Sequence, residues 1–280
     1  MTRDLLLHVG SPKCGSTYLQ NVLLRNATLL EANGVRYPHD GGGHPGNAAD
    51  IKQITAETLE RYFEGGKHKV ILSHEDLFSL TPHGAALSEL APKHDIRVQV
   101  MLFLRPFSEF VYGDYSQFMK QFFARFLETR NPYDGRDFET FAQRRIQTMT
   151  PHLYLRRWQS RFPETPVILA SHRDLKARLS DWLGADLARD MDWKISPDKI
   201  NKSLRMQDCD AMAAAMRDPN VSNSQIEAMH RQAFRNVAQA DAGRTVARTA
   251  WLEAQFAPQN KALLEEFGFD NRHPDHGGPG

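Results

Sequence analysis

Residues 8–19 read HVGSPKCGSTYL and lie between an apolar run, DLLL, and a helix-like run, LQNVLLRNATLL. A strand, a glycine-containing turn and a helix in this order are typical of a phosphate-binding loop. In nucleoside triphosphatases that loop reads G-x-x-x-x-G-K-[ST], and Gly10 and Gly15 have its glycine spacing. The position after the second glycine holds Ser16, however. The lysine of the loop is Lys13, three residues earlier.

The loop has the groups that an anion needs even with its lysine displaced. A helix that begins at about residue 16 would point unpaired backbone N–H groups and the positive end of its dipole at the loop. Glycine lets the backbone approach the anion closely, two hydroxyls add hydrogen bonds, and the lysine adds a charge. The residues expected to bind the anion are Lys13, Cys14, Gly15, Ser16 and Thr17.

The rest of the chain alternates between predicted strands and helices. Strands are predicted for DLLLHVG (4–10), KVILSHE (69–75), IRVQVMLFLR (96–105) and TPVILAS (165–171). Helices are predicted for residues 16–32, 106–128 and 173–183, and the chain from about residue 206 is helical without strand signals. This order predicts a three-layer α/β/α fold with a central, mostly parallel sheet, similar to that of P-loop NTPases, and a helical C-terminal part.

Ligands of such sheets bind beyond the carboxyl ends of the strands. Three polar segments follow predicted strands directly: the loop itself, SHED at residues 73–76 and LRPF at residues 104–107. We therefore expect these segments to converge in space, although each alone would be an ordinary turn between a strand and a helix.

Composition sets limits on the partners and the compartment. The 280 residues are 41% hydrophobic and 25% charged, and the formal net charge is +1, so we expect no nucleic-acid partner. Two cysteines suit a reducing compartment, and neither a signal peptide nor a transmembrane segment is visible, so we expect a cytoplasmic protein. Residues 1–270 are expected to form one domain, and residues 271–280 a disordered tail.

The sequence argues against a bound metal. A Walker-type lysine works with Mg²⁺ that is held in part by an acid after a second strand, and no clear strand of that kind ends in aspartate. One strand ends in SHED and the next in Arg105, and neither fits that pattern, which favours an anion held by cations alone. The twelve histidines show no zinc-ligand spacing. An ATP-dependent P-loop kinase remains an alternative.

The segment GSPKCGSTYLQ, residues 10–20, resembles the 5′-phosphosulfate loop of the sulfotransferases that use 3′-phosphoadenylyl sulfate (PAPS). Their loop commonly reads P-K-x-G-[ST]-[ST]. The resemblance, to bacterial members above all, spans roughly residues 4–268. It implies in-line transfer of a sulfuryl group from PAPS to a hydroxyl or amine, without a metal, leaving 3′-phosphoadenosine 5′-phosphate (PAP). An inactive protein that only binds PAP or PAPS is a further alternative.

The resemblance also implies a site for the 3′-phosphate. Many bacterial sulfotransferases resemble the pattern R-x₇-S-x-Y-x-Q-x-x-K, and here Arg105, Tyr115, Gln117 and Lys120 are in register. The serine position holds Gly113, so one hydroxyl is missing. Its absence is expected to weaken binding of the 3′-phosphate by about 1 kcal/mol. Without the resemblance, the tyrosine, glutamine and lysine would be ordinary packing or solvated residues of a helix.

In the family, the loop lysine stabilises the leaving group and a histidine or glutamate is the general base. The resemblance therefore implies that Lys13 is catalytic. Candidates for the base are Glu75, in SHED, and His44, in the Gly/Pro-rich segment 34–47, with His39 and His74 as weaker ones. Glu75 could instead be an acid in the first turn of a helix, and His44 a loop residue without a role.

The sequence does not identify the acceptor more closely than a small molecule or a glycan, and it does not indicate the oligomeric state. Residues 34–50 and 118–133 are expected to shape the acceptor pocket. Arg125, Arg130 and Arg136 could contact an acidic glycan, or they could be solvated charges on a helix.

Overall fold

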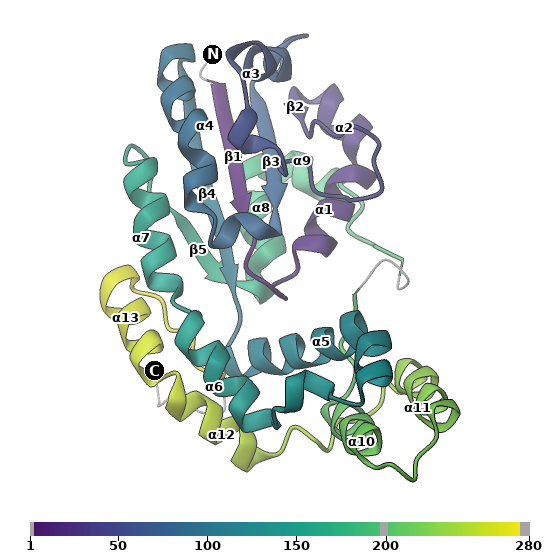
Figure 1. Cartoon of the computed structure of the whole chain (residues 1–280). Coiled ribbons are helices and arrows are strands. Elements are labelled where there is room, and N and C mark those ends of the chain that lie inside the picture. The colour runs from purple at the N-terminus through teal and green to yellow at the C-terminus, as the bar shows by residue number, and fades with distance from the viewer. Residues whose placement is uncertain (1–2, 197–200, 275–280) are drawn as a thin grey trace. The chain divides into compact units, whose positions relative to one another are not determined.

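The computed structural model describes residues 3–196 and 201–274, which form two compact units (Figure 1). Unit 1 comprises Met1–Arg105, Pro151–Asn201 and Glu266–Phe269, and unit 2 comprises Pro106–Thr150, Lys202–Glu265 and Asp270–Gly280. The expectation that residues 1–270 form one domain stays a prediction.

Unit 1 contains a five-stranded sheet in the order β2-β3-β1-β4-β5, and all neighbouring strands are parallel. The strands are β1 Arg3–Val9, β2 Val35–Arg36, β3 Lys69–His74, β4 Ile96–Leu104 and β5 Ile168–Ser171. The predicted fold class is confirmed. Strand β2 lies in the Gly/Pro-rich segment 34–47 and was not among the predicted strands, because two residues are too few to show a period.

Helices cover both faces of this sheet, as the continuous apolar runs of its strands require. In Figure 1, α3 Ala56–Phe63, α4 Ala85–Leu90 and α7 Pro151–Arg161 lie on the viewer's side, and α8 Leu175–Leu183 and α9 Ala185–Asp190 lie behind. Leu6 of β1 packs in one cluster with Leu23 of α1 (Ser16–Arg25) and Leu179 of α8. All three side chains are fully buried.

The helix predicted for residues 16–32 is in fact two helices, α1 Ser16–Arg25 and α2 Ala27–Ala32. Asn26 stands between them, and its side chain explains the break. Its amide donates to the carbonyl oxygens of Val22 (2.8 Å) and Asp192 (2.9 Å), and its Oδ1 accepts from the backbone N–H of Asp192 (2.8 Å). A buried side chain thus ties the helix end to a segment far along the chain.

Unit 2 is helical. Its helices are α5 Phe107–Thr129, α6 Phe138–Thr148, α10 Met206–Arg217, α11 Asn223–Arg235, α12 Val246–Gln255 and α13 Ala257–Phe267, the last two residues of which belong to unit 1. The described residues from 206 onward contain no strand, as predicted. The long helix α5 has nearly the predicted bounds, and two of its apolar residues, Phe118 and Phe122, are only half-buried.

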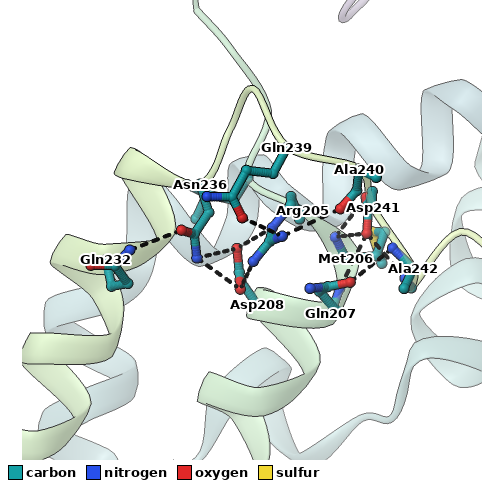
Figure 2. Close-up of polar contacts among 12 residues, drawn as sticks. Arg205, Met206, Gln207, Asp208, Gln232, Asn236, Gln239, Ala240, Asp241 and Ala242 are labelled. Atoms are coloured by element: carbon teal, nitrogen blue, oxygen red, sulfur yellow. Dashed lines mark hydrogen bonds and ion pairs between the residues drawn. The ribbon is translucent and has the colours of Figure 1, made fainter.

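A polar network joins the segment 236–244 to the first turn of α10 (Figure 2). The Asp241 carboxylate accepts hydrogen bonds from the backbone N–H groups of Met206 (2.8 Å) and Gln207 (3.4 Å). Beside it, Arg205 donates to both oxygens of Asp208, at 2.8 and 2.9 Å. Asp241 therefore caps a helix that begins 35 residues before it.

The expected disordered tail falls partly outside the described residues, since residues 275–280 are not among them. Before that point Asn271 is buried, and the guanidinium of Arg272 pairs with Asp270. In the described part of the chain, no helix has both the length and the apolar character that crossing a membrane requires.

Candidate functional site

The carboxyl ends of β1 and β3 meet directly at the loop. Val9 pairs with His74, and the backbone N–H of Gly10 donates to the His74 carbonyl oxygen at 3.3 Å. A Cβ on Gly10 would lie 2.3 Å from Ser16 Oγ and 2.9 Å from the Cα of Glu75. Gly10 is therefore required because two chain segments approach it closely, and Glu75 lies beside the loop as expected.

The loop is a turn that ends in a glycine-capped helix. The backbone N–H of Cys14 donates to the Ser11 carbonyl oxygen (3.2 Å), which closes a four-residue turn with Lys13 at its third position. Lys13 has a φ of 63°, a left-handed conformation that glycine usually supplies at this position of a type II turn and that costs other residues about 1 kcal/mol or more. Gly15, with a φ of 92°, follows as the N-cap of α1.

The N-terminus of α1 carries no side-chain cap. Gly15 has no side chain to cap the helix, and the first turn carries no acidic residue. Ser16 is 7% exposed, and among the described residues its hydroxyl has no hydrogen-bond partner. The N–H groups of this turn and a buried hydroxyl therefore gather at the same place, where the dipole of the helix is positive.

Arg105, which follows β4, lies beside this loop. Burial raises the pKa of the Cys14 thiol to about 11, although the charge and hydrogen bonds of Arg105 act in the opposite direction. The thiol donates to the Pro12 carbonyl oxygen (3.5 Å), and its raised pKa favours the protonated form over the nucleophilic thiolate at neutral pH. The Nε of Arg105 is buried and has no hydrogen-bond partner in the described residues. All three strand ends that were expected to converge do so.

Glu75, directly after β3, is held at both carboxylate oxygens. Gln20 Nε2 donates to Oε2 at 3.2 Å, and His44 Nε2 lies 3.3 Å from Oε1. Burial tends to raise the pKa of Glu75, but hydrogen bonds from Gln20 and from the backbone, with a smaller electrostatic contribution of the nearby imidazoles, outweigh it and bring the pKa below its usual value. A third of the side chain is exposed, so an ionised carboxylate is presented to solvent.

The two candidates for the base, Glu75 and His44, form a pair with unequal roles. His44 Nδ1 accepts a hydrogen bond from the backbone N–H of Gly46 (3.0 Å), which leaves the hydrogen of a neutral ring on Nε2, facing Glu75. The His44 ring stacks on His74 at 5.1 Å, and His39 Nε2 lies 2.7 Å from the His44 carbonyl oxygen. His44 is thus the donor and Glu75 the acceptor.

Sequence reasoning missed the buried partners of this pair. Gln20 of α1 is fully buried, and its amide donates to Ser73 Oγ at 3.1 Å as well as to Glu75. His8 Nδ1 lies 2.8 Å from the same Ser73 hydroxyl, and burial lowers the pKa of His8 to about 4. The signal in the sequence was a polar residue within each of two mostly apolar predicted strands, His8 in one and Ser73 in the other.

The other residues of the proposed 3′-phosphate pattern lie on α5, in unit 2. The Tyr115 ring is buried and stacks on Tyr133 at 3.9 Å, and Lys120 Nζ donates to the Lys202 carbonyl oxygen (2.8 Å). Both contacts are structural. Gly113 is buried within the helix, and a weaker grip on a 3′-phosphate stays a prediction.

A cavity of about 540 Å³ lies next to the segment that carries His44. Its lining includes Pro38, His39, Asn47 and Tyr62. The described residues contain no group of three or more His, Cys, Asp or Glu side chains that could hold a metal ion.

Among known proteins, solved structures include one that is similar to this chain. No protein-family model matches the chain, and neither does any curated protein. A sulfotransferase from Alicyclobacillus acidocaldarius is similar in structure, with 13% sequence identity, a TM-score of 0.46 and coverage of 98% of both chains. An identity and a TM-score this low establish neither an activity nor the role of any residue.

Proposed function

We propose that this protein is a PAPS-dependent sulfotransferase. The proposal rests mainly on the loop. A lysine lies in its tight turn, and the N-terminus of the helix that follows has no side-chain cap. Two buried donors beside it have no hydrogen-bond acceptor among the described residues. These donors are the hydroxyl of Ser16 and the Nε of Arg105. Leaving a buried donor unpaired costs about 1–3 kcal/mol, and an anion that accepts from both would remove this cost.

The residues present suit the 5′-phosphosulfate end of PAPS. The backbone N–H groups at residues 14–17 and the hydroxyls of Ser16 and Thr17 would hold its oxygens, and Lys13 and Arg105 would balance its charge. PAPS would supply a sulfuryl group on a phosphate leaving group, a transfer that needs mainly positioning and charge stabilisation. The ammonium of Lys13 would offset the negative charge that grows on the leaving phosphate.

Glu75 would take the proton of the acceptor hydroxyl while the acceptor oxygen forms its bond to sulfur. Its carboxylate is ionised at neutral pH, because its pKa is lowered, and Gln20 and His44 fix its orientation. The Nδ1 lone pair of His44 is already used by the Gly46 N–H, so we assign His44 a positioning role. The base is weaker than one with a pKa near 7, and positioning compensates for that.

The cavity lined by His39, Gly46 and Asn47, which flank His44 in the sequence, is the proposed acceptor pocket. Its volume of about 540 Å³ lies within the roughly 300–1,000 Å³ of ordinary ligand pockets. Because histidine, asparagine and tyrosine side chains line it, a small polar alcohol or one unit of a glycan fits better than a lipid chain.

Calorimetry with PAP, with AMP and with ATP plus Mg²⁺ tests the proposal on the wild type, Lys13→Ala and Lys13→Gly. We expect PAP to bind and AMP to bind much more weakly, because AMP lacks the 3′-phosphate that the protein would contact. Each Lys13 variant should lose about 10- to 100-fold in PAP affinity, the worth of a charged hydrogen bond. The glycine variant suits the left-handed turn, so a loss shared by both variants reports on the ammonium group.

Lys93→Ala, at an exposed lysine of unit 1, is the control and should bind PAP as the wild type does. Binding of ATP with Mg²⁺ but not of PAP would overturn the proposal in favour of a kinase. PAP binding without sulfuryl transfer to any acceptor in a screen with labelled PAPS would identify an inactive binding protein.

A further inference from the structure

Unit 2 contains a small cavity between α5, α6 and the short helix Pro132–Gly135, and aromatic rings form its floor. Phe118 and Phe122 are four residues apart and so lie on one face of α5, and Phe141 comes from α6. The Phe118 ring meets the Phe122 and Phe141 rings edge-on, at 5.3 and 5.2 Å. The cavity has a volume of about 200 Å³.

Four arginines form the wall of this cavity: Arg125, Arg136, Arg144 and Arg145. Two of their guanidinium groups lie over rings of the floor, Arg125 over Phe122 at 4.7 Å and Arg145 over Phe118 at 4.8 Å. Such stacking holds a guanidinium group in place while leaving its N–H edge able to donate. The floor therefore orients the cations of the wall.

Nearby carboxylates do not neutralise this wall. Asp134 is shared, with Oδ1 3.1 Å from Arg125 and Oδ2 2.7 Å from Arg136, and Asp114 lies 2.5 Å from Arg145. Four arginines face two aspartates, which leaves two positive charges in excess. The Nε of Arg136 is buried without a hydrogen-bond partner in the described residues.

Arg130 differs from its neighbours, although the sequence suggested it as a contact for an acidic glycan. Its guanidinium donates to the carbonyl oxygens of Val221 (2.8 Å) and Ala215 (3.5 Å), which satisfies the end of α10 and the segment after it. It serves the packing of unit 2. Arg144, which the sequence did not single out, is exposed at the cavity, and no ion pair of its guanidinium is found within residues 3–196 and 201–274.

We propose that this cavity binds one anionic sugar unit of an acidic glycan, through its carboxylate or sulfate group. Planar guanidinium forks match the oxygens of both groups. The cavity is smaller than a site for a drug-sized ligand, so it takes one unit of a chain. RNA is disfavoured because guanidinium groups cover the Phe118 and Phe122 faces on which bases would stack. The site does not depend on the transferase proposal.

Calorimetry at low salt tests the site with four probes: a heparin tetrasaccharide, which carries sulfate and carboxylate, a tetragalacturonate, which carries carboxylate alone, neutral cellotetraose, and a ten-nucleotide poly(U). We expect at least one acidic sugar to bind and the neutral sugar not to bind. Binding should weaken as salt rises, because the charges are exposed to solvent.

Variants of the wall identify the site. Arg144→Gln should weaken binding of the acidic sugar about 5- to 10-fold, and Arg144→Glu should abolish it, while Arg235→Gln, an exposed arginine elsewhere in unit 2, should change it less than twofold. Arg144 is chosen because its loss leaves the Arg145–Asp114 contact intact. PAP binding, measured on the same samples, should be unchanged.

Three outcomes would overturn the site: no binding of either acidic sugar, equal binding by Arg144→Glu and the wild type, or stronger binding of poly(U) than of the sugars. Since the PAP measurement is separate, a failure here leaves the transferase proposal to its own test. If both hold, an acidic glycan is the acceptor to try first.

Discussion

Glu75 is the residue on which the proposed chemistry can be tested most directly. Glu75→Gln keeps the shape of the side chain but removes the group that accepts the proton. We expect sulfuryl transfer to the acceptor found by screening to fall about 10²- to 10⁴-fold, with PAP affinity within twofold of the wild type. Turnover with labelled PAPS and calorimetry with PAP measure the two quantities.

Glu89→Gln, at an exposed carboxylate of α4, is the matched control and should keep full turnover. The assignment of the base would be wrong if Glu75→Gln retained activity while His44→Gln lost it. In that case His44 would take the proton itself, and the Gly46 N–H would have to release Nδ1.

At this scale the sequence singles out the charged residues of the proposed site and misses the uncharged ones that bond to them. Lys13, Glu75 and Arg105 stand out because each is a charged residue in a predicted turn or at the end of a predicted strand. Gln20 does not stand out, because one polar residue near the start of a helix has many uses. Its role depends on β3 placing Ser73 and Glu75 within reach of both amide hydrogens.

Among the elements, α10 shows a helix start that is stabilised from a distance. Its N-cap residue, Arg205, supplies no side-chain cap in the described structure, and the Asp241 carboxylate accepts from Met206 and Gln207 instead (Figure 2). Asp241→Ala removes both this cap and a charge near the positive end of the helix. We expect it to lower the free energy of unfolding by about 1–2 kcal/mol, measured by urea denaturation.

Asp218→Ala is the control for Asp241→Ala. Asp218 is exposed at the C-terminal end of the same helix, where a negative charge opposes the dipole, so its removal should change the stability by less than about 0.5 kcal/mol. Equal losses in the two variants would mean that the network around Asp241 does not hold the helix start.

Elements whose pattern is local are predicted well, and those fixed by distant contacts are not. Strands β1, β3 and β4 are apolar runs that end in polar residues, and their bounds agree with prediction to within a residue. The break at Asn26 could not be predicted, because the asparagine bonds to Asp192, 166 residues away. The same holds for the Asp241 cap of α10.

For the whole molecule, the topology follows from the alternation of strands and helices, because parallel neighbours and right-handed crossovers leave few arrangements. That alternation also predicts that the loop, Glu75 and Arg105 meet at one edge of the sheet. It does not reveal that three buried polar residues, His8 of β1, Ser73 of β3 and Gln20 of α1, form a chain of hydrogen bonds that leads to Glu75. We expect this chain to couple the proposed site to the stability of the fold.

His8 makes that coupling measurable as a dependence of stability on pH. Burial lowers the pKa of His8 from 6.5 to about 4, so between these values the unfolded chain binds a proton that the folded protein excludes. The contribution of His8 to stability is therefore complete above about pH 6.5 and is lost as the pH falls, by up to about 3 kcal/mol near pH 4. Glu75, whose pKa is lowered, stays ionised through most of this window.

We expect the unfolding free energy of the wild type, from urea titrations at pH 7, 6 and 5, to fall about 1 kcal/mol per pH unit more steeply than that of His8→Gln. Glutamine can still donate to Ser73 but cannot take up a proton. His83→Gln, at a partly exposed histidine of unit 1, should keep the steep wild-type dependence. Equal slopes for the wild type and His8→Gln would mean that His8 becomes protonated in the folded protein, and the buried chain would then have to accommodate a charge.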